Sequence, residues 1–415
     1  MKSIKGKVVN EKTMIVTADI GKDKHYGYWR CPDGTDVKPF AFRNDGRGFQ
    51  EFWERVSRAK NVHNIEEIVF GYESTGSYAE PFVHFLRARG VHLVQVNPMH
   101  TKRVKDLQGN SPIKTDEKDP KVIADIIALG HALTVVVPEG PAAELRRLTQ
   151  ARERSNGRYV ALVNQLQSLV AIIFPEFLEI MKNVKTLSAL YLLKEYTSPK
   201  DLVVLGLDNL TNTLRKVSRG KIGEERAKTL YEAAKTSVGA TEGLVSITRE
   251  IQEIIVGIKA AERFTESLEN EMTYYLKQVP YSGSILSLKG IKEVIAAGLI
   301  GEVGDFRKYK TISEIIKLAG LDLFEISSGK HKGRRRISKR GRPLLRKLLY
   351  FASLNTVRSG GIMHNKYQQY LDRGMPKNKA LIAVARKLLG IIFAVVRDQS
   401  IYRNTFTKTS VQEAA

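Results

Sequence analysis

Hydrophobic positions in the first quarter of the chain alternate between the period of a strand and the period of a helix. Short runs rich in β-branched and aromatic residues predict strands at residues 14–20, 24–30, 36–42, 66–72 and 92–96. Pro39 places the third strand at a sheet edge, because proline lacks the N–H that a central strand donates. Helical spacing covers residues 48–59 and 79–90. Strands that alternate with helices predict an α/β domain over residues 1–150, a sheet covered by helices.

The helical period then takes over. Long helices are predicted at residues 142–174 and 242–279, with charged residues on their outer faces. Spacings of three and four alternate, as in a coiled-coil seam, along Leu244, Ile247, Ile251, Ile254 and Ile258. We predict a helical hairpin or coiled-coil arm over residues 151–278 that serves as a linker and dimerisation region, with an irregular middle near residues 184–240. An ordinary helical domain is the alternative.

A third region of mainly α structure is predicted over residues 279–403. Helices are expected at residues 312–319, 344–357 and 377–396. Before them, short helical stretches punctuated by glycine resemble a helix-hairpin-helix, whose turn presents backbone N–H groups to phosphates. The glycines are Gly290, Gly298, Gly301 and Gly304. The polar tail, residues 404–415, is expected to fray.

Charge narrows the choice of partner. The 415 residues include 67 Lys and Arg against 44 Asp and Glu, a formal charge of +23 that favours a polyanion, most often nucleic acid. The single cysteine, Cys31, excludes a disulfide framework and a zinc site of paired cysteines, and fits a reducing compartment. Arg386 and Lys387 interrupt the most apolar run, so no membrane span is expected and the predicted location is the cytoplasm.

Acidic residues stand out against this basic background. Asp19 and Glu73 each follow a predicted strand, where the carboxyl edge of a sheet presents side chains to a crevice. Asp116 and Asp119 lie three residues apart on one face of a turn or helix start. Four carboxylates from three segments suit a pair of Mg²⁺ ions about 3.5–4 Å apart, as in two-metal phosphoryl transfer. Each acid has a structural alternative as a cap or ion pair, and Asp119 before Pro120 is an ordinary helix start.

These segments resemble a known family. TADIGKDKH, YESTGSY, NPMHTKRVKD and KTDEKD are similar to the RuvC-like (RNase H-like) domain of the DEDD transposases of the IS110 insertion-sequence family. The resemblance implies that the D-E-D-D set is Asp19, Glu73, Asp116 and Asp119, and that these bind Mg²⁺ or Mn²⁺. Pro120 departs from the family pattern, which usually has alanine after the last aspartate.

The second informative region is the basic segment that begins at Ile326. It carries eight cations without one acid: Lys330, Lys332, Arg334, Arg335, Arg336, Lys339, Arg340 and Arg342. Such crowding favours contact with phosphates over a solvated surface. Ser327 and Ser328 stand at its head. A serine among guanidinium groups is suited to attack a phosphodiester, and a hydroxyl that only contacts phosphate is the alternative.

The C-terminal third resembles the transposase domain of the same family. LKGIKEVIAAGLIGEVGDF, KLAGLDL, SSGKHKGRRRISKRGRPLLRKLLY and KNKALIAVARKLL carry the resemblance. It implies a serine nucleophile directly before a glycine, in a pattern close to SGxxxGxRxI. The chain reads SGKHKGRRRI over residues 328–337, so the matching position is Ser328, with Ser327 in reserve.

The resemblance implies a DNA transposase that cuts and rejoins donor and target DNA, guided by a structured bridge RNA. It also implies a dimer or tetramer, because the acidic site and the serine that act on one strand come from different protomers. Two alternatives remain. One is a metal-only RuvC-like nuclease or junction resolvase, in which water attacks. The other is a non-catalytic RNA- or DNA-binding scaffold.

Overall fold

The computed structural model describes residues 9–73, 76–108, 118–134, 137–325, 333 and 335–403. The chain divides into two compact units, Met1–Val136 and Val137–Ala415. No helix in these described ranges is long and apolar enough to cross a membrane. The predicted division at residues 150 and 278 stays a prediction.

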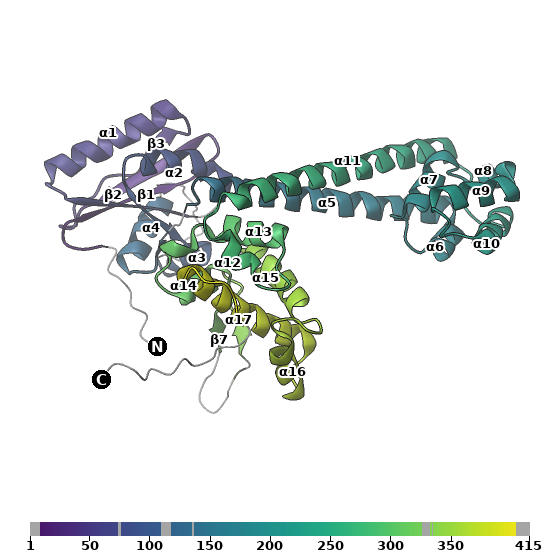
Figure 1. Ribbon diagram of the computed structural model, residues 1–415. Helices are drawn as coiled ribbons and strands as arrows, with labels where there is room; N and C mark the ends of the chain where they lie inside the picture. The colour runs from purple at the N-terminus through teal and green to yellow at the C-terminus, as the bar shows by residue number, and fades with distance from the viewer. Residues whose placement is uncertain are drawn as a thin grey trace, which may run out of the picture. The chain divides into compact units, whose positions relative to one another are not determined.

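The first unit is built on a mixed sheet (Figure 1). Its strands within the described ranges are β1 (Thr13–Asp19), β2 (Lys24–Arg30), β3 (Phe40–Arg43), β4 (Glu67–Glu73), β5 (His92–Val96) and β6 (Leu133–Thr134). Their order across the sheet is β3-β2-β1-β4-β5-β6. β1, β4 and β5 are parallel, whereas β2, β3 and β6 each run antiparallel to a neighbour. β3 is an edge strand, as Pro39 predicts, and is shorter than expected.

Helices cover both faces of this sheet. On one face, α1 (Gly46–Val62) and α2 (Glu80–Arg87) contribute to an aromatic cluster in which the rings of Phe52 and Phe82 each contact Phe70 of β4. On the other face, α4 (Asp119–Ala128) buries its apolar side against residues of β1, β4 and β5. A further helix, α3 (Pro98–Gln108), follows β5. The first unit is therefore the α/β domain that the hydrophobic periods predict.

A long helical hairpin dominates the start of the second unit (Figure 1). It pairs α5 (Pro141–Ile173) with α11 (Leu244–Lys277), which matches the two predicted long helices within two residues at each end. Cross-helix hydrogen bonds run from Gln165 to Glu250 and from Arg152 to Glu269, so the helices are antiparallel. The seam residues Ile251, Ile254 and Ile258 are buried.

The middle of this region is not irregular, and that expectation is wrong. Short helices form a bundle around their own core at the distal end of the hairpin (Figure 1): α6 (Pro175–Ile180), α7 (Leu187–Glu195), α8 (Pro199–Leu205), α9 (Leu207–Val217) and α10 (Glu224–Lys235). Only a few residues separate the end of each of these helices from the start of the next. Thr186 caps α7, Ser198 and Asp201 form a capping box on α8, and Gly206 takes a positive φ between α8 and α9. Helices this short leave no extended period in the sequence.

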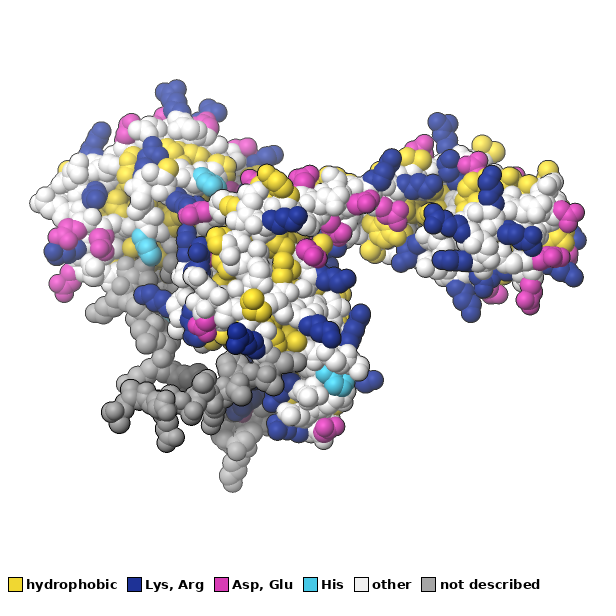
Figure 2. Space-filling model, viewed as in Figure 1, with side chains coloured by type: hydrophobic (Ala, Val, Ile, Leu, Met, Phe, Trp, Pro, Cys, Tyr) yellow, Lys and Arg dark blue, Asp and Glu magenta, His cyan; other side chains and the backbone are white. Residues whose placement is uncertain are grey.

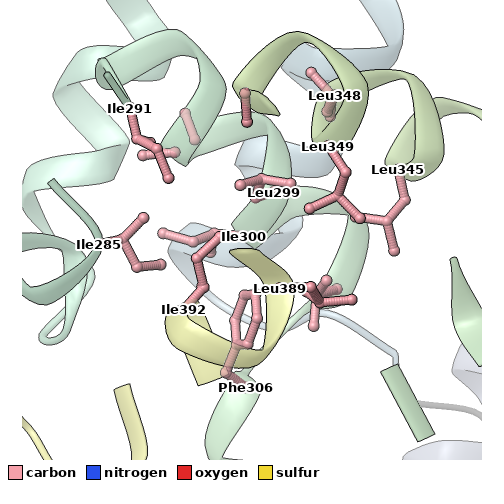
Figure 3. Close-up of a cluster of buried hydrophobic side chains, with 14 of the residues drawn as sticks. Ile285, Ile291, Leu299, Ile300, Phe306, Leu345, Leu348, Leu349, Leu389 and Ile392 are labelled. Atoms are coloured by element: carbon pink, nitrogen blue, oxygen red, sulfur yellow. The ribbon is translucent and has the colours of Figure 1, made fainter. Parts of the chain in front are cut away.

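The C-terminal core joins the base of the hairpin to a cluster of helices. These are α12 (Ser282–Leu286), α13 (Glu293–Val303), α14 (Ile312–Leu318), α15 (Pro343–Thr356), α16 (His364–Asp372) and α17 (Lys377–Arg397). Figure 3 shows side chains of α12, α13, α15 and α17 meeting in this core, with Leu299 and Leu349 fully buried. Gly301 of α13 lies directly against α5, where an added Cβ would fall 2.7 Å from the backbone nitrogen of Arg146.

Candidate active site

The register of the sheet places Asp19 and Glu73 side by side. β1 and β4 are parallel, and the last paired residues are Ala18 and Tyr72. Asp19 and Glu73 come next in each strand, and both are partly buried. Because parallel strands end at the same edge, the two carboxylates share the carboxyl edge of the sheet, as their positions in the sequence predict.

The first turn of α4 lies against this edge. The Thr17 hydroxyl donates a 2.7 Å hydrogen bond to the backbone oxygen of Pro120, and Thr17 is on the same face of β1 as Asp19. Gly71, two residues before Glu73, leaves room for the helix, because an added Cβ would lie 2.1 Å from the Ile127 side chain. Asp119, which directly precedes Pro120, is therefore carried to the edge that ends in Asp19 and Glu73.

Asp119 does not cap its helix. Lys118 is the N-cap residue, and no side chain makes a capping hydrogen bond there. Instead the Asp119 carboxylate forms an ion pair with Lys105 of α3, whose Nζ lies 2.6 Å from Oδ2. The Asp119 side chain is only 14% exposed, so this pair is partly sheltered from solvent.

A buried histidine fixes the turn that follows Asp19. The Gly21 N–H donates a 3.2 Å hydrogen bond to Nδ1 of His25, and His25 is fully buried with its ring against Phe42, Phe49 and Phe82. Burial lowers the pKa of His25, so the ring is neutral and free to accept this bond. A side chain at position 21 would fall 2.3 Å from the Lys24 carbonyl oxygen, so the turn requires glycine.

The acidic set is only partly described. Asp116, together with the rest of residues 109–117, lies outside the described residues. Among those the structure does describe, no cluster of three or more His, Cys, Asp or Glu side chains is arranged to hold a metal ion. The donors at the edge are nevertheless all carboxylate oxygens, the ligands that Mg²⁺ and Mn²⁺ prefer.

In the second unit, two short strands flank the segment that carries the predicted serine and pair with each other. β7 (Leu323–Phe324) pairs antiparallel with β8 (Arg336–Ile337), with Phe324 opposite Arg336. The residues between them include Ser327, Ser328, Lys330, Lys332 and Arg334, all outside the described part of the chain. The ladder thus brings the two ends of this segment together.

The remaining cations of the basic segment fall into two groups. Arg336, Lys339 and Arg340 are exposed, as phosphate contacts require. Arg335 is also exposed but pairs with Glu325 at 2.8 Å. Arg342 is partly buried and donates to the backbone oxygen of Glu302, so it anchors the segment to α13. Figure 2 shows Lys and Arg side chains spread widely over the visible face.

Sequence reasoning missed Lys105, Thr17 and His25. Lys105 lies in the run NPMHTKRVKD, where nothing in the sequence separates it from Lys102 or Arg103. A threonine inside a strand and a histidine in an aromatic run carry no signal of their own. Their roles depend on contacts between residues up to 103 positions apart.

The first unit has carboxylates at the parallel edge of a mixed sheet, and the second unit carries the basic segment around β7 and β8. Both features are typical of an enzyme that acts on nucleic acid. Family comparison makes the class specific. A transposase model of the IS110 DEDD type matches residues 16–175, and the model described as transposase of the IS116/IS110/IS902 family matches residues 283–368. The chain belongs to this family of insertion-sequence transposases.

Relatives match along almost the whole chain. The insertion element IS116 uncharacterized 44.8 kDa protein of Streptomyces clavuligerus is 24% identical over 390 residues, covering 93% of this chain and 95% of that protein. The insertion element IS110 uncharacterized 43.6 kDa protein of Streptomyces coelicolor is 21% identical, covering 93% and 94%. The transposase for insertion sequence element IS1111A of Coxiella burnetii is 23% identical, covering 89% and 90%.

Proposed function

We propose that this protein moves its insertion sequence by cutting and rejoining DNA with Ser328 as nucleophile and a metal site of Asp19, Glu73, Asp116 and Asp119. The observation that carries the proposal is the parallel register that ends β1 and β4 in Asp19 and Glu73, with Asp119 on the adjoining turn. The same strand order, with antiparallel β2 beside parallel β1, β4 and β5, supports a RuvC-like fold for the first unit.

The acidic residues would hold Mg²⁺ or Mn²⁺, which supplies Lewis-acid polarisation of the scissile phosphate. The chain itself fixes where that happens. Thr17 holds the first turn of α4 against β1, and His25 holds the turn after Asp19. Carboxylates placed on a sheet edge and a helix start keep their geometry better than carboxylates on long loops.

In the chemical step, the Ser328 Oγ attacks the phosphorus and forms a 5′-phosphoserine bond while the bond to the 3′-oxygen breaks. The serine loses its proton, and the departing strand takes one up as a free 3′-OH. Religation is the reverse step with a different 3′-OH, so bond energy is conserved. The exposed cations Arg336, Lys339 and Arg340 would stabilise the charge that develops on the phosphate.

Partner choice rests on charge. A formal charge of +23 suits both DNA and an RNA guide, with base pairing between guide and DNA supplying sequence choice and the protein contacting backbones. A dimer or tetramer would bring the serine of one protomer to the acidic site of another. The cytoplasm of a prokaryotic cell, at its DNA, is the proposed place of action.

A covalent-trap assay tests this function. The protein, purified with its accompanying RNA, is incubated with Mg²⁺ and labelled DNA that carries the element junction, and DNA joined to protein is sought on a denaturing gel. We expect an adduct that is lost in Ser328→Ala and in Asp19→Asn. Glu67→Gln, at the opposite end of β4 from Glu73, is the matched control and should leave the adduct intact.

Each alternative has its own outcome. An adduct that survives Ser328→Ala but not Ser327→Ala would move the nucleophile by one residue. Cleavage without an adduct, unchanged by either serine variant, would indicate a metal-only nuclease or resolvase. Nucleic-acid binding without cleavage or adduct, unchanged in Asp19→Asn and Glu73→Gln, would indicate a non-catalytic scaffold whose acids are structural.

A further inference from the structure

The hairpin of α5 and α11 carries a hollow on its side that has no part in the proposed chemistry. Its volume is about 530 Å³, and it is lined by Ala151, Arg154, Arg158 and Phe264. A volume of this size is within the range of ligand sites. Its lining combines two cations and an aromatic ring on two rigid helices.

The two arginines differ from their neighbours on α5. Arg146 lies 3.8 Å from the carboxylate of Glu302, and Arg152 lies 2.7 Å from that of Glu269. Arg154 and Arg158 are exposed and have no ion-pair partner in the part of the chain that the structure describes. They are one helical turn apart, so their like charges repel, and no ion pair with a described residue offsets that repulsion.

The aromatic ring is equally unusual for its place. Phe264 is 44% exposed, although most apolar residues of α11 that face α5 are buried. The Arg158 guanidinium lies 5.9 Å from the centre of its ring. The ring therefore has one cation over it, is nearly half exposed, and lines the hollow.

The two helices that carry the lining residues are joined by hydrogen bonds close to them in the sequence. The buried Ser155 hydroxyl donates to the backbone oxygen of Ala261 at 3.3 Å, and the Thr265 hydroxyl donates to Ser155 at 3.0 Å. These bonds tie α5 to α11 at residues adjacent in the sequence to Arg154 and Phe264. Side chains carried by two helices that are joined in this way lose little freedom of movement when a ligand binds, which lowers the entropy cost of binding.

We propose that this hollow binds an unpaired nucleotide of single-stranded nucleic acid. The base stacks on Phe264, and the adjoining phosphate accepts hydrogen bonds from Arg154 and Arg158. Guanidinium groups match phosphate geometry, and stacking on an aromatic ring is the usual way to hold an unpaired base. A second copy of the chain would bring the same uncompensated arginines to the interface. A duplex keeps its base faces covered. The site goes beyond the proposed function, since it needs neither the acidic residues nor the serine.

Binding of fluorescently labelled single strands tests the site. Short RNA and DNA oligonucleotides of the same mixed sequence, and the corresponding DNA duplex, are titrated with the full-length protein and followed by anisotropy. Phe264→Ala and the double variant Arg154→Gln/Arg158→Gln should each weaken single-strand binding about tenfold, the loss of one stacked base or two phosphate contacts. Duplex binding should change much less.

Matched controls separate stacking from general charge. Phe351→Ala removes an equally exposed phenylalanine from α15, and Arg226→Gln/Lys228→Gln removes two exposed cations from α10. Both should leave single-strand binding within about twofold. Phe264→Trp, which keeps an aromatic ring at this position, should retain single-strand binding. The fluorescence of the introduced tryptophan should be quenched by single strands but not by the duplex. Only Trp29 and Trp53 contribute otherwise, and both lie in the first unit.

Several results would overturn the proposal. Unchanged single-strand binding in both hollow variants would do so, as would equal losses for single strands and duplex. A change of molecular mass in light scattering for Phe264→Ala, with binding unchanged, would identify a second copy as the occupant. A loss confined to the RNA oligonucleotide, or to the DNA, identifies the source of the strand. Ser328→Ala should bind like the wild type, so the site can fail or hold independently of the proposed chemistry.

Discussion

The Lys105 ammonium lies 2.6 Å from the Asp119 carboxylate and joins the helix that follows β5 to the first turn of α4. Both residues are distant in the sequence from β1, yet Thr17 of that strand bonds to the residue next to Asp119. A proposed metal ligand is thus held in an ion pair by a side chain from a separate element. Binding a divalent cation at Asp119 places like charge beside this ammonium.

Removal of Lys105 should therefore strengthen metal binding. Lys105→Gln takes away a positive charge next to a proposed ligand, and the Mg²⁺ concentration for half-maximal adduct formation should fall about three- to tenfold. Manganese binding, followed by electron paramagnetic resonance, should shift in the same direction. Lys102→Gln, an exposed position on the same helix, is the control. A higher metal requirement in Lys105→Gln would mean that the lysine chiefly orients Asp119.

The two ends of β4 should respond differently to loss of charge. Glu73→Gln should reduce DNA cleavage by at least about a hundredfold, because it removes a proposed metal ligand at the carboxyl edge. Glu67→Gln, at the first residue of the strand, should retain wild-type cleavage. Thermal unfolding of both variants should stay near that of the wild type. Equal activity of the two would exclude Glu73 from the site.

Acid should destabilise the first unit through His25. Because burial lowers its pKa from the usual 6.5, the unfolded chain takes up a proton that the folded chain refuses. The stabilisation is complete above about pH 6.5 and is lost as the pH falls from there toward the folded-state pKa. The slope approaches about 1.4 kcal/mol per pH unit.

Unfolding of the first unit between pH 5 and 7.5 can be followed by the fluorescence of Trp29 and Trp53. His25→Phe, which suits the surrounding aromatic rings, should flatten the dependence on pH. His84→Phe, at an exposed position on α2, should leave it as in the wild type. Identical slopes for His25→Phe and the wild type would contradict this assignment.

One substitution should have opposite effects at two glycines. Gly301→Ala puts a Cβ 2.7 Å from the backbone of α5, and should lower the free energy of unfolding of the second unit by about 1–3 kcal/mol. Gly390→Ala lies in α17 with open space around it, and should raise that free energy by up to about 1 kcal/mol. Circular dichroism during chemical denaturation measures both. A neutral Gly301→Ala would mean that α13 can move away from α5 without loss.

The elements with a clear period were predictable. β2 and β5 have the predicted limits, and β1 and β4 differ from prediction by one residue at each end. These limits were predictable because turn residues mark where each hydrophobic run of a buried strand begins and ends. The placement of Asp19 and Glu73 at the same edge of the sheet was predictable for the same reason. It needs only two strands to be parallel and to end where their hydrophobic runs end.

Other features depend on partners that no local pattern encodes. β7 and β8 have two residues each, too few for a period, and they are fixed by pairing across the basic segment. The bundle of α6 to α10 was hidden because its helices are short and their apolar faces meet only in three dimensions. Lys105 is one of several cations on α3, and only packing selects the one that reaches Asp119.

Because the hairpin of α5 and α11 is long, a small change of angle at its base displaces its far end by a large distance. Helices of 33 and 34 residues extend about 50 Å at the usual rise, and separate hydrophobic cores lie at the two ends. At that length, a 10° change in the angle at which α5 leaves the core would displace the distal bundle by about 9 Å, nearly the width of a helix. The contact of Gly301 with the α5 backbone therefore influences the position of the distal bundle of α6 to α10, which is far from Gly301.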